Sequence, residues 1–204
     1  MTLHLAIDCE STGLFDYTKP ADAEGQPRVC QIGMIWLDHD LSVKGEAEYL
    51  VRPDGWSISP EATAINGLTQ DMLEQHGTSI NTALERYAEA IDTRHIIVGF
   101  NVPYDIKLMR GELRRYQMED RYMQTRTLCV MQGCRDIVGA RTKQGRKKNP
   151  TLEEACSYFG IEREPLPHRA LGGARAVLSI LQKMREQGRM PAYKDPYDKT
   201  AHAR

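Results

Sequence analysis

Short, largely apolar runs separated by turn residues dominate the first half of the chain. Leu3 to Ile7 and Val29 to Leu37 are runs of strand length, and Glu46 to Val51 follows after a turn. Ile96 to Phe100 is apolar throughout, which is typical of a strand buried on both faces. The pattern predicts a meander of three strands and one further, buried strand.

Helix signals follow the third of these strands. Ser59 and Pro60 place a cap residue before a proline at the first helical position, and Thr69 caps another helix after Asn66-Gly67. Thr151 to Glu154 has the pattern of a capping box, which starts a helix that runs to Phe159. Amphipathic or apolar periodicity predicts further helices over Ile80–Ile91, Tyr104–Tyr116, Thr127–Val138 and Ala170–Gln187.

The order of these elements predicts the fold class. Three strands followed by helices and a further strand indicate an α/β protein with a mixed sheet and helices on both faces. We find no internal repeat and no domain linker. Residues 1–188 are therefore expected to form one domain, whereas residues 189–204 lack periodicity and predict a polar, flexible C-terminal tail.

Composition excludes several classes of protein. A chain of 204 residues can form one domain with a sizeable core. Its 27 basic and 28 acidic residues give a net charge of −1, so any affinity for nucleic acid must come from a local patch. Five cysteines without CxxC spacing argue against a disulfide framework or zinc ribbon. Reduced thiols fit better, so we expect a cytoplasmic protein. The sequence shows neither a membrane-spanning apolar segment nor a signal peptide, so we expect no membrane partner.

Two carboxylates end the first predicted strand. Asp8 and Glu10 are two residues apart, so their side chains point to the same face of that strand. Like charges this close repel each other, and a hard cation such as Mg²⁺ or Mn²⁺ would relieve the repulsion through oxygen ligands. The alternative is a pair of strand-end acids that face water, and the pair alone does not decide between them.

Two further candidate groups stand at the ends of predicted elements. Asn101 and Asp105 flank the start of a helix, where an acid can also serve only to complement the helix dipole. His168 lies just before the last helix, and a loop histidine is usually a polar surface group. Near a metal cluster, however, an imidazole that titrates near neutrality can take a proton from an attacking water.

Together these stretches resemble the histidine-containing branch (DEDDh) of the DEDD-type 3′–5′ exonucleases, which includes the bacterial polymerase proofreading subunit, oligoribonuclease and ribonuclease T. Asp8 to Gly13 is similar to the family's Asp-x-Glu-(Thr/Ser)-(Thr/Ser)-Gly. Ser59 to Thr69 resembles the segment that approaches the substrate's 3′ end, and Asn101 to Asp105 resembles the Asn-x-x-x-Asp element. His168 resembles the general base. The motifs occur in the family's order over about residues 3 to 185, which makes the resemblance specific.

The resemblance implies a ribonuclease H-like fold and an exonuclease-like domain over residues 1–188. It implies phosphodiester hydrolysis at a 3′ end of single-stranded DNA or RNA, with two divalent metal ions, Mg²⁺ or Mn²⁺. In this scheme Asp8 bridges both ions, Glu10 holds the first, Asp105 holds the second, and His168 is the general base. Substrate contacts are expected from Ser11, Thr12, Gly13, Leu14, Asn66 and Asn101.

One position departs from the family pattern. The family has His, four residues, then Asp, and the count from His168 arrives at Gly173. The fourth metal carboxylate is therefore missing, which should weaken metal binding. Three explanations stay open: an introduced inactivating change, a natural substitution in which water or Glu164 fills in, or a degenerate relative kept for binding.

A basic loop provides a second candidate contact with nucleic acid. Arg141 to Lys148 contains five basic residues and no acid, and Arg146, Lys147 and Lys148 could follow a phosphate backbone. The alternative is a solvated charged loop without such a role.

Two functions of different classes remain open. The first is a 3′–5′ exonuclease, and the second is a catalytically inactive nucleic-acid-binding module on the same fold; Gly173 separates them. An enzyme with Cys9 as nucleophile is disfavoured, because no histidine adjoins it and its strand neighbours are acids. The choice between DNA and RNA depends on contacts to the 2′-hydroxyl, which the sequence does not give. A homodimer is compatible with the resemblance, but no zipper pattern or obvious apolar patch predicts one.

Overall fold

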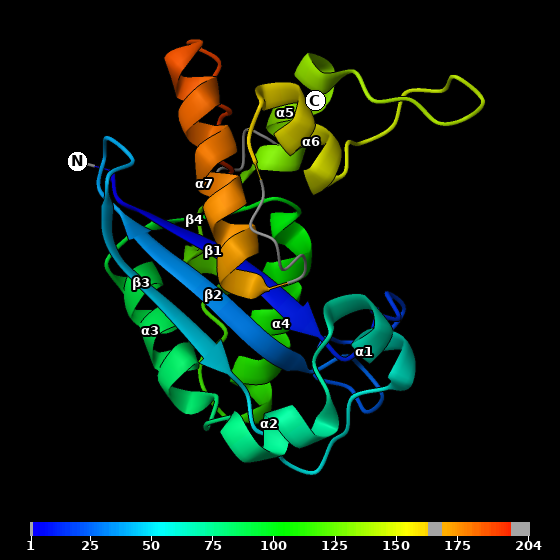
Figure 1. Ribbon diagram of the computed structural model, residues 1–204. Helices are drawn as coiled ribbons and strands as arrows, with labels where there is room; N and C mark the ends of the chain where they lie inside the picture. The colour runs from blue at the N-terminus through cyan, green and yellow to red at the C-terminus, as the bar shows by residue number, and fades with distance from the viewer. Residues whose placement is uncertain (1, 163–168, 197–204) are drawn as a thin grey trace.

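A mixed five-stranded sheet forms the centre of the molecule (Figure 1). The computed structural model describes residues 2–162 and 169–196. The sheet has the spatial order β3-β2-β1-β4-β5, with antiparallel pairing of β1–β2 and β2–β3 and parallel pairing of β1–β4 and β4–β5. The strands are β1 (His4–Ser11), β2 (Val29–Leu37), β3 (Val43–Leu50), β4 (Ile96–Gly99) and β5 (Thr127–Cys129).

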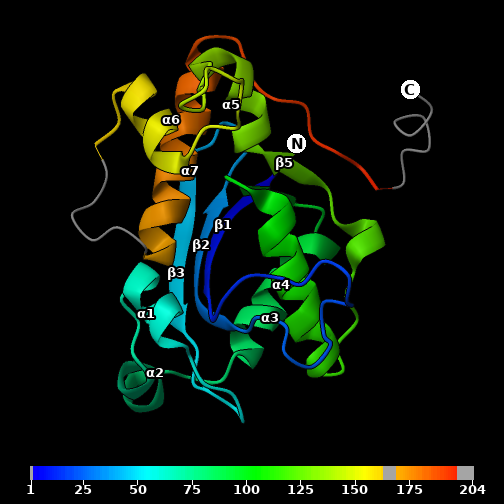
Figure 2. The same cartoon turned by 90° about the vertical axis from the view of Figure 1, so that its right-hand side faces the viewer.

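Helices cover both faces of the sheet, as the sequence predicts. Figure 2 shows α6 and α7 on one side of the sheet and α3 and α4 on the other. No helix within residues 2–162 and 169–196 combines the length and the apolar character that a membrane crossing requires. The helices are α1 (Pro60–Asn66), α2 (Gln70–His76), α3 (Asn81–Asp92), α4 (Val102–Arg115), α5 (Val130–Val138), α6 (Leu152–Phe159) and α7 (Ala170–Glu186), with a 3₁₀ turn over Tyr122–Gln124.

The alternation of side chains along β1 divides the core into two layers. Leu5 and Ile7 pack with the residues of α3 and α4, whereas Ala6 packs with those of α7 on the opposite face. Continued to the end of the strand, the same alternation places Asp8 and Glu10 on the α7 face. Asp8 and Glu10 therefore lie on the same face of the sheet, at the end of β1.

A glycine in β2 allows the start of α7 to lie directly on the sheet. A Cβ atom at Gly33 would lie 2.4 Å from the Ala170 carbonyl carbon, so any side chain there would push the helix away. The Ala170 amide donates to Gln31 Oε1 (3.1 Å) and the Leu171 amide donates to Glu48 Oε1 (3.3 Å). The residue before α7 forms no capping hydrogen bond through its side chain. Side chains of β2 and β3 therefore accept hydrogen bonds from the free amides in the first turn of the helix.

Local signals place most elements correctly, but one strand was missed. The capping box is confirmed, since the Glu154 amide donates to Thr151 Oγ1 and the Thr151 amide donates to Glu154 Oε2. The expected helix over Thr127–Val138 is wrong in its first three residues, which form β5 beside β4. Three residues are too few to show a strand period, and α5 follows without a turn.

The beginning of the expected C-terminal tail is attached to the sheet. Thr127 of β5 and Lys194 exchange two backbone hydrogen bonds, of 2.9 and 2.7 Å. Residues 197–204 lie outside the described residues, so the flexibility of the tail stays a prediction.

Candidate active site

A cavity of about 250 Å³ lies where β1 and β4 end. Two stretches that are far apart in the sequence, one at the end of β1 and one at the start of α4, meet there. The start of α6 and the residue before α7 complete its wall. Its lining residues are Asp8, Cys9, Glu10, Phe100, Asn101, Tyr104, Asp105, Leu152 and Arg169.

Asp105 is the buried member of this group. It sits in the first turn of α4, is 4% exposed, and accepts a hydrogen bond from the Cys9 amide at 3.0 Å. Burial raises the pKa of Asp105 to about 7, and the charge of Glu10 contributes in the same direction. The cost of ionising this carboxylate falls when a cation is close by, as a metal site would provide.

Gly173 lies directly beside Asp8. A Cβ atom at Gly173 would lie 2.0 Å from Asp8 Oδ2 and 2.7 Å from Asp8 Cγ. The first turn of α7 therefore brings residue 173 against the Asp8 carboxylate of β1. In this chain, the Asp8 carboxylate occupies the space that a side chain at residue 173 would use.

The predicted general base lies outside the described residues, as does Glu164. Arg169, the residue that follows His168, lines the cavity and adds a positive charge to its wall. The assignment of His168 stays a prediction.

The Ser-Thr-Gly turn after β1 is held by its own polar groups and does not line the cavity. Ser11 Oγ donates to the Gly13 carbonyl at 2.9 Å, and the Tyr104 hydroxyl donates to the same carbonyl at 2.6 Å. The Asn66 side chain from the end of α1 donates to the Ser11 carbonyl at 3.2 Å. Asn66 is 5% exposed, so it fixes α1 against the turn.

The remaining residues of the turn differ in their surroundings. Thr12 Oγ1 accepts a hydrogen bond from the Arg28 amide at 2.9 Å, which connects the turn to the start of β2. Leu14 is 86% exposed, an unusual position for a large apolar side chain, and it lies one residue beyond the hydrogen-bonded turn. Asn101 is exposed at the start of α4 and lines the cavity.

Sequence reasoning missed several residues of the cavity wall. Tyr104 precedes Asp105 and links α4 to the Ser11–Gly13 turn, and its adjacency to a candidate ligand was the available signal. Leu152 and Arg169 reach the cavity only because α6 and α7 both begin there. Nothing local in the sequence marks them.

The basic loop forms an arm, here called the basic arm (Arg141–Lys148). Figure 1 shows the segment between α5 and α6 projecting from the body of the molecule. Lys147 Nζ lies 2.5 Å from Asp136 of α5, and Lys148 Nζ lies 2.7 Å from Glu154 of α6. The structure therefore pairs two of the three predicted phosphate contacts with carboxylates at the base of the arm.

The donors around the cavity fit a hard divalent cation in type. Asp8, Glu10 and Asp105 offer carboxylate oxygens, which Mg²⁺ and Mn²⁺ prefer. In the part of the chain that the structure describes, no three Asp, Glu, His or Cys side chains converge closely enough to hold an ion as they stand. Asp8 is turned toward Gly173 and Asp105 toward the Cys9 amide, so we expect a shared cation to require rotation of these side chains.

A family model described as "Exonuclease" matches residues 5–181. The match includes all but the first residue of β1, the start of α4, the residues that line the cavity and most of α7. A search of curated proteins gives no match.

Several solved structures share the fold. Escherichia coli exonuclease I in complex with a dT13 oligonucleotide is 19% identical, with a TM-score of 0.75, and the alignment covers 91% of this chain and 41% of that chain. Exonuclease I from Methylocaldum szegediense is 20% identical, with a TM-score of 0.74 and coverage of 92% and 41%. A zinc-bound form of the E. coli exonuclease I–single-stranded DNA complex has the same values.

These likenesses confirm the predicted α/β, ribonuclease H-like fold. The chain spans only about 41% of the length of these exonuclease I chains. At 19–20% sequence identity, these comparisons establish the fold of the chain but not its activity.

Proposed function

The chain belongs to the exonuclease family, and from that premise we propose that it is a metal-dependent nuclease that shortens single-stranded DNA or RNA from the 3′ end. The supporting observation is the meeting of Asp8, Glu10 and Asp105 at one cavity, with position 173 against Asp8. Asp8, Glu10 and Asp105 resemble three of the acids of the DEDD-type exonucleases, and His168 resembles the general base of their histidine-containing branch. That branch is therefore part of the proposal.

The three carboxylates would hold the divalent cations, Mg²⁺ or Mn²⁺. A cation bound there would supply the positive charge that activates a water and stabilises charge on phosphoryl oxygens. His168 would take the proton of the attacking water. Arg169 would face the phosphate from the cavity wall, and the Cys9 amide would keep the Asp105 carboxylate oriented.

Residues around the mouth of the cavity would hold the substrate. Ser11, Thr12, Gly13 and Asn66 would act by fixing the turn, because their polar groups are engaged in hydrogen bonds to neighbouring residues. Leu14 would offer an apolar surface to a terminal base, and Asn101 a polar group at the cavity. Arg146, Lys147 and Lys148 of the basic arm would contact backbone phosphates.

The relatives support a single strand as the substrate. The E. coli exonuclease I structures contain dT13 and dA16 oligonucleotides. Those ligands belong to a protein more than twice as long, so the preference for DNA over RNA is a matter for experiment.

Gly173 favours a second candidate function. A chain that lacks the fourth carboxylate could bind single strands on the same surface without hydrolysing them. In that case the cavity and the basic arm would be used for binding alone.

The decisive assay follows a 5′-labelled single strand in the presence of Mg²⁺ or Mn²⁺. The proposal expects a ladder that shortens from the 3′ end, and a matched strand with a blocked 3′ end should persist. The Asp8→Asn variant, which keeps the shape of the side chain, serves as the inactive control. Binding without shortening would support the second candidate, and neither binding nor shortening would reject both.

A further inference from the structure

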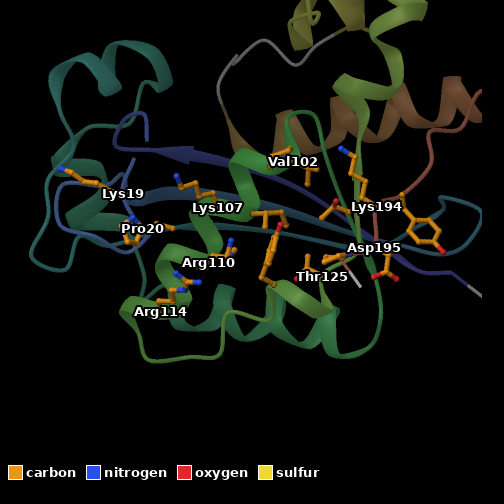
Figure 3. Close-up of a pocket in the computed structure, with 16 residues that line it drawn as sticks. Lys19, Pro20, Val102, Lys107, Arg110, Arg114, Thr125, Lys194 and Asp195 are labelled. Carbon is orange, nitrogen blue, oxygen red and sulfur yellow. The ribbon is translucent and has the colours of Figure 1, made fainter. Parts of the chain in front are cut away.

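A second, larger groove lies along the outer face of α4. It has a volume of about 760 Å³ and is built from α4, the loop before β2, the segment around the 3₁₀ turn, and residues 193–196 beside β5. Figure 3 shows Lys107, Arg110 and Arg114 along α4, with Lys19 and Pro20 on one side and Lys194 and Asp195 on the other.

This groove is separate from the candidate active site. Pro103, Lys107, Arg110 and Arg114 are spaced by three or four residues, so they share one face of α4. At 3.6 residues per turn, Asp105 projects from the opposite face. The two cavities approach each other only at the first turn of the helix, where Val102 and Pro103 line the groove and Asn101 and Tyr104 line the site.

The groove is rich in positive charge. Lys19, Lys107, Arg110, Arg114 and Lys194 line it, against one carboxylate, Asp195. Asp120 pairs with both arginines, Asp22 lies 3.4 Å from Arg114, and Asp16 lies 3.6 Å from Lys19. Carboxylates therefore balance the charge of three of these five cations.

Lys107 and Lys194 are the two groove cations that are available to an anionic ligand. Lys107 Nζ lies 4.3 Å from the centre of the Tyr17 ring, and Lys194 Nζ donates to Gln132 Oε1 at 3.1 Å. Within residues 2–162 and 169–196, neither lysine forms an ion pair with a carboxylate. These two ammonium groups are therefore the strongest candidates for contact with an anion.

Exposed aromatic rings accompany the cations. Tyr122 and Tyr193 line the groove and are 41% and 50% exposed. Arg110 lies 4.0 Å from the centre of the Tyr122 ring, and Arg126 lies 5.6 Å from that of Tyr193. Rings next to cations provide stacking surfaces for bases beside contacts for phosphates, which is how proteins bind single strands with little regard to sequence.

We propose that this groove is a second binding site for single-stranded nucleic acid, which holds the strand away from the carboxylate cavity. The proposal rests on the proposed function for the nature of the ligand, but it concerns binding and not hydrolysis. An acidic protein surface would match the charges equally well. The exposed tyrosines favour a polynucleotide, because bases can stack on them.

The test measures binding of fluorescent single strands to the full chain in EDTA, so that cleavage plays no part. The Lys107→Gln/Lys194→Gln double variant should bind a strand of about 16 nucleotides several-fold more weakly and reduce the slope of log affinity against log salt by about 1.4, the value for two lost phosphate contacts. Tyr193→Ala should weaken binding by about tenfold, whereas Tyr193→Phe should retain it.

A matched control carries the same charge change elsewhere. Lys44 and Arg86 line a groove of about 600 Å³ that also contains Glu46 and Glu89, so its charge is balanced. The Lys44→Gln/Arg86→Gln double variant should bind like the parent. Equal weakening by both double variants would show that only net charge matters and would overturn the proposal.

Two more results would overturn the second site, and one would separate it from the proposed function. Parent-like binding by the Lys107→Gln/Lys194→Gln variant rejects the site. Equally tight binding of polyglutamate, with no effect of Tyr193→Ala, rejects a polynucleotide as its ligand. A parent that binds single strands through this groove but never shortens them would support the site and reject the nuclease.

Discussion

The Asp8 carboxylate fills the space next to the Gly173 Cα. A Cβ atom at residue 173 would lie 2.0 Å from Asp8 Oδ2, far shorter than the non-bonded contacts of a Cβ atom, so a side chain at residue 173 would require the Asp8 side chain to move. The absence of a Cβ atom at Gly173 therefore permits the observed direction of the Asp8 side chain. The state of the site depends on both residues together.

Replacement of Asp8 tests the metal assignment. Asp8→Ala removes one of two neighbouring acids, so the stability of the metal-free protein should stay constant or rise. Nuclease activity should fall by at least about 10²–10³-fold, the usual cost of losing one group that stabilises the transition state. Thermal unfolding in EDTA and the 3′-shortening assay measure the two effects. Activity within a few-fold of the parent would remove Asp8 from the proposed metal site.

Asp105 should make the stability of the metal-free protein fall as pH rises. Its pKa is raised to about 7 by burial, against about 3.9 for an unfolded chain. Between those values the folded state binds more protons than the unfolded state, so the free energy of unfolding decreases with rising pH and levels off above about 7. The total effect is on the order of a few kcal/mol.

The Asp105→Asn variant isolates the contribution of Asp105 to the pH dependence of stability. Its side chain does not titrate, and its amide oxygen can still accept the hydrogen bond from the Cys9 amide. Chemical denaturation from pH 4 to 8 should show a flatter profile for the variant than for the parent. Mg²⁺ or Mn²⁺ should restore stability to the parent above pH 7, since a cation favours the ionised carboxylate. Identical profiles in EDTA would show that Asp105 does not titrate in this range.

Glu112 should be a major contributor to stability. It is 1% exposed and accepts hydrogen bonds from Arg28 Nε at 2.9 Å and from the Val29 amide at 3.1 Å. Glu112→Ala leaves the Arg28 guanidinium largely buried without its carboxylate, which typically costs about 3–5 kcal/mol. Urea denaturation measures the change. The exposed Glu89→Ala, which breaks a surface pair with Arg86, is the control and should have little effect.

The basic arm should contribute uniformly to binding of unrelated strands. Replacing Arg146, Lys147 and Lys148 with Ala removes three cations, so the slope of log affinity against log salt should fall by about 2. Lys147 and Lys148 must first leave Asp136 and Glu154 to reach phosphates. If one of these lysines stays paired with its carboxylate, the slope will fall by less than about 2.

The matched control for the arm replaces Lys183, Arg185 and Arg189 with Ala at the far end of α7. The 17 residues of that helix place this end about 25 Å from the cavity. If both triple variants change the salt slope equally, the arm has no specific role.

Much of the fold could be predicted because its signals are local. The Thr151 cap and the alternation along β1 each depend on a few neighbouring residues, and the structure agrees with both. β5 could not be found in this way, since its three residues are ordered by pairing with β4. Lys194 pairs with Thr127 at the free edge of β5, a contact between residues 67 positions apart that no local pattern indicates.

In the candidate site too, some residues could be predicted from local motifs, whereas others depend on contacts between distant parts of the chain. The acids of β1 and Asp105 could be proposed from motifs, but the 3.0 Å hydrogen bond from Cys9 to Asp105 joins residues 96 positions apart. Arg169 and Leu152 reach the cavity because α6 and α7 start there, and Gly33 sets how closely α7 approaches. The direction of the Asp8 side chain depends on all of these packed elements, so the collision with residue 173 is visible only in three dimensions.

The last prediction concerns Gly173→Asp. The new side chain must displace the Asp8 carboxylate and adds a like charge beside it, so the metal-free variant should unfold at a lower temperature than the parent. A divalent cation should reverse this loss by binding the completed set of acids. With Mg²⁺, the rate of 3′ shortening should rise by about 10²–10³-fold. The gain should be smaller with Mn²⁺, because Mg²⁺ is the more demanding of the two in geometry.

Gly173→Ala separates the two parts of this change. It introduces the same Cβ atom against Asp8 without a carboxylate, and it improves helix propensity by about 1 kcal/mol. It should therefore show no gain in rate and no stabilisation by Mg²⁺ beyond that of the parent. If Ala raises the rate as much as Asp, the reorientation of Asp8 and not the added ligand limits the site. If the parent already matches Gly173→Asp with Mg²⁺, another group supplies the fourth ligand and the site is intact.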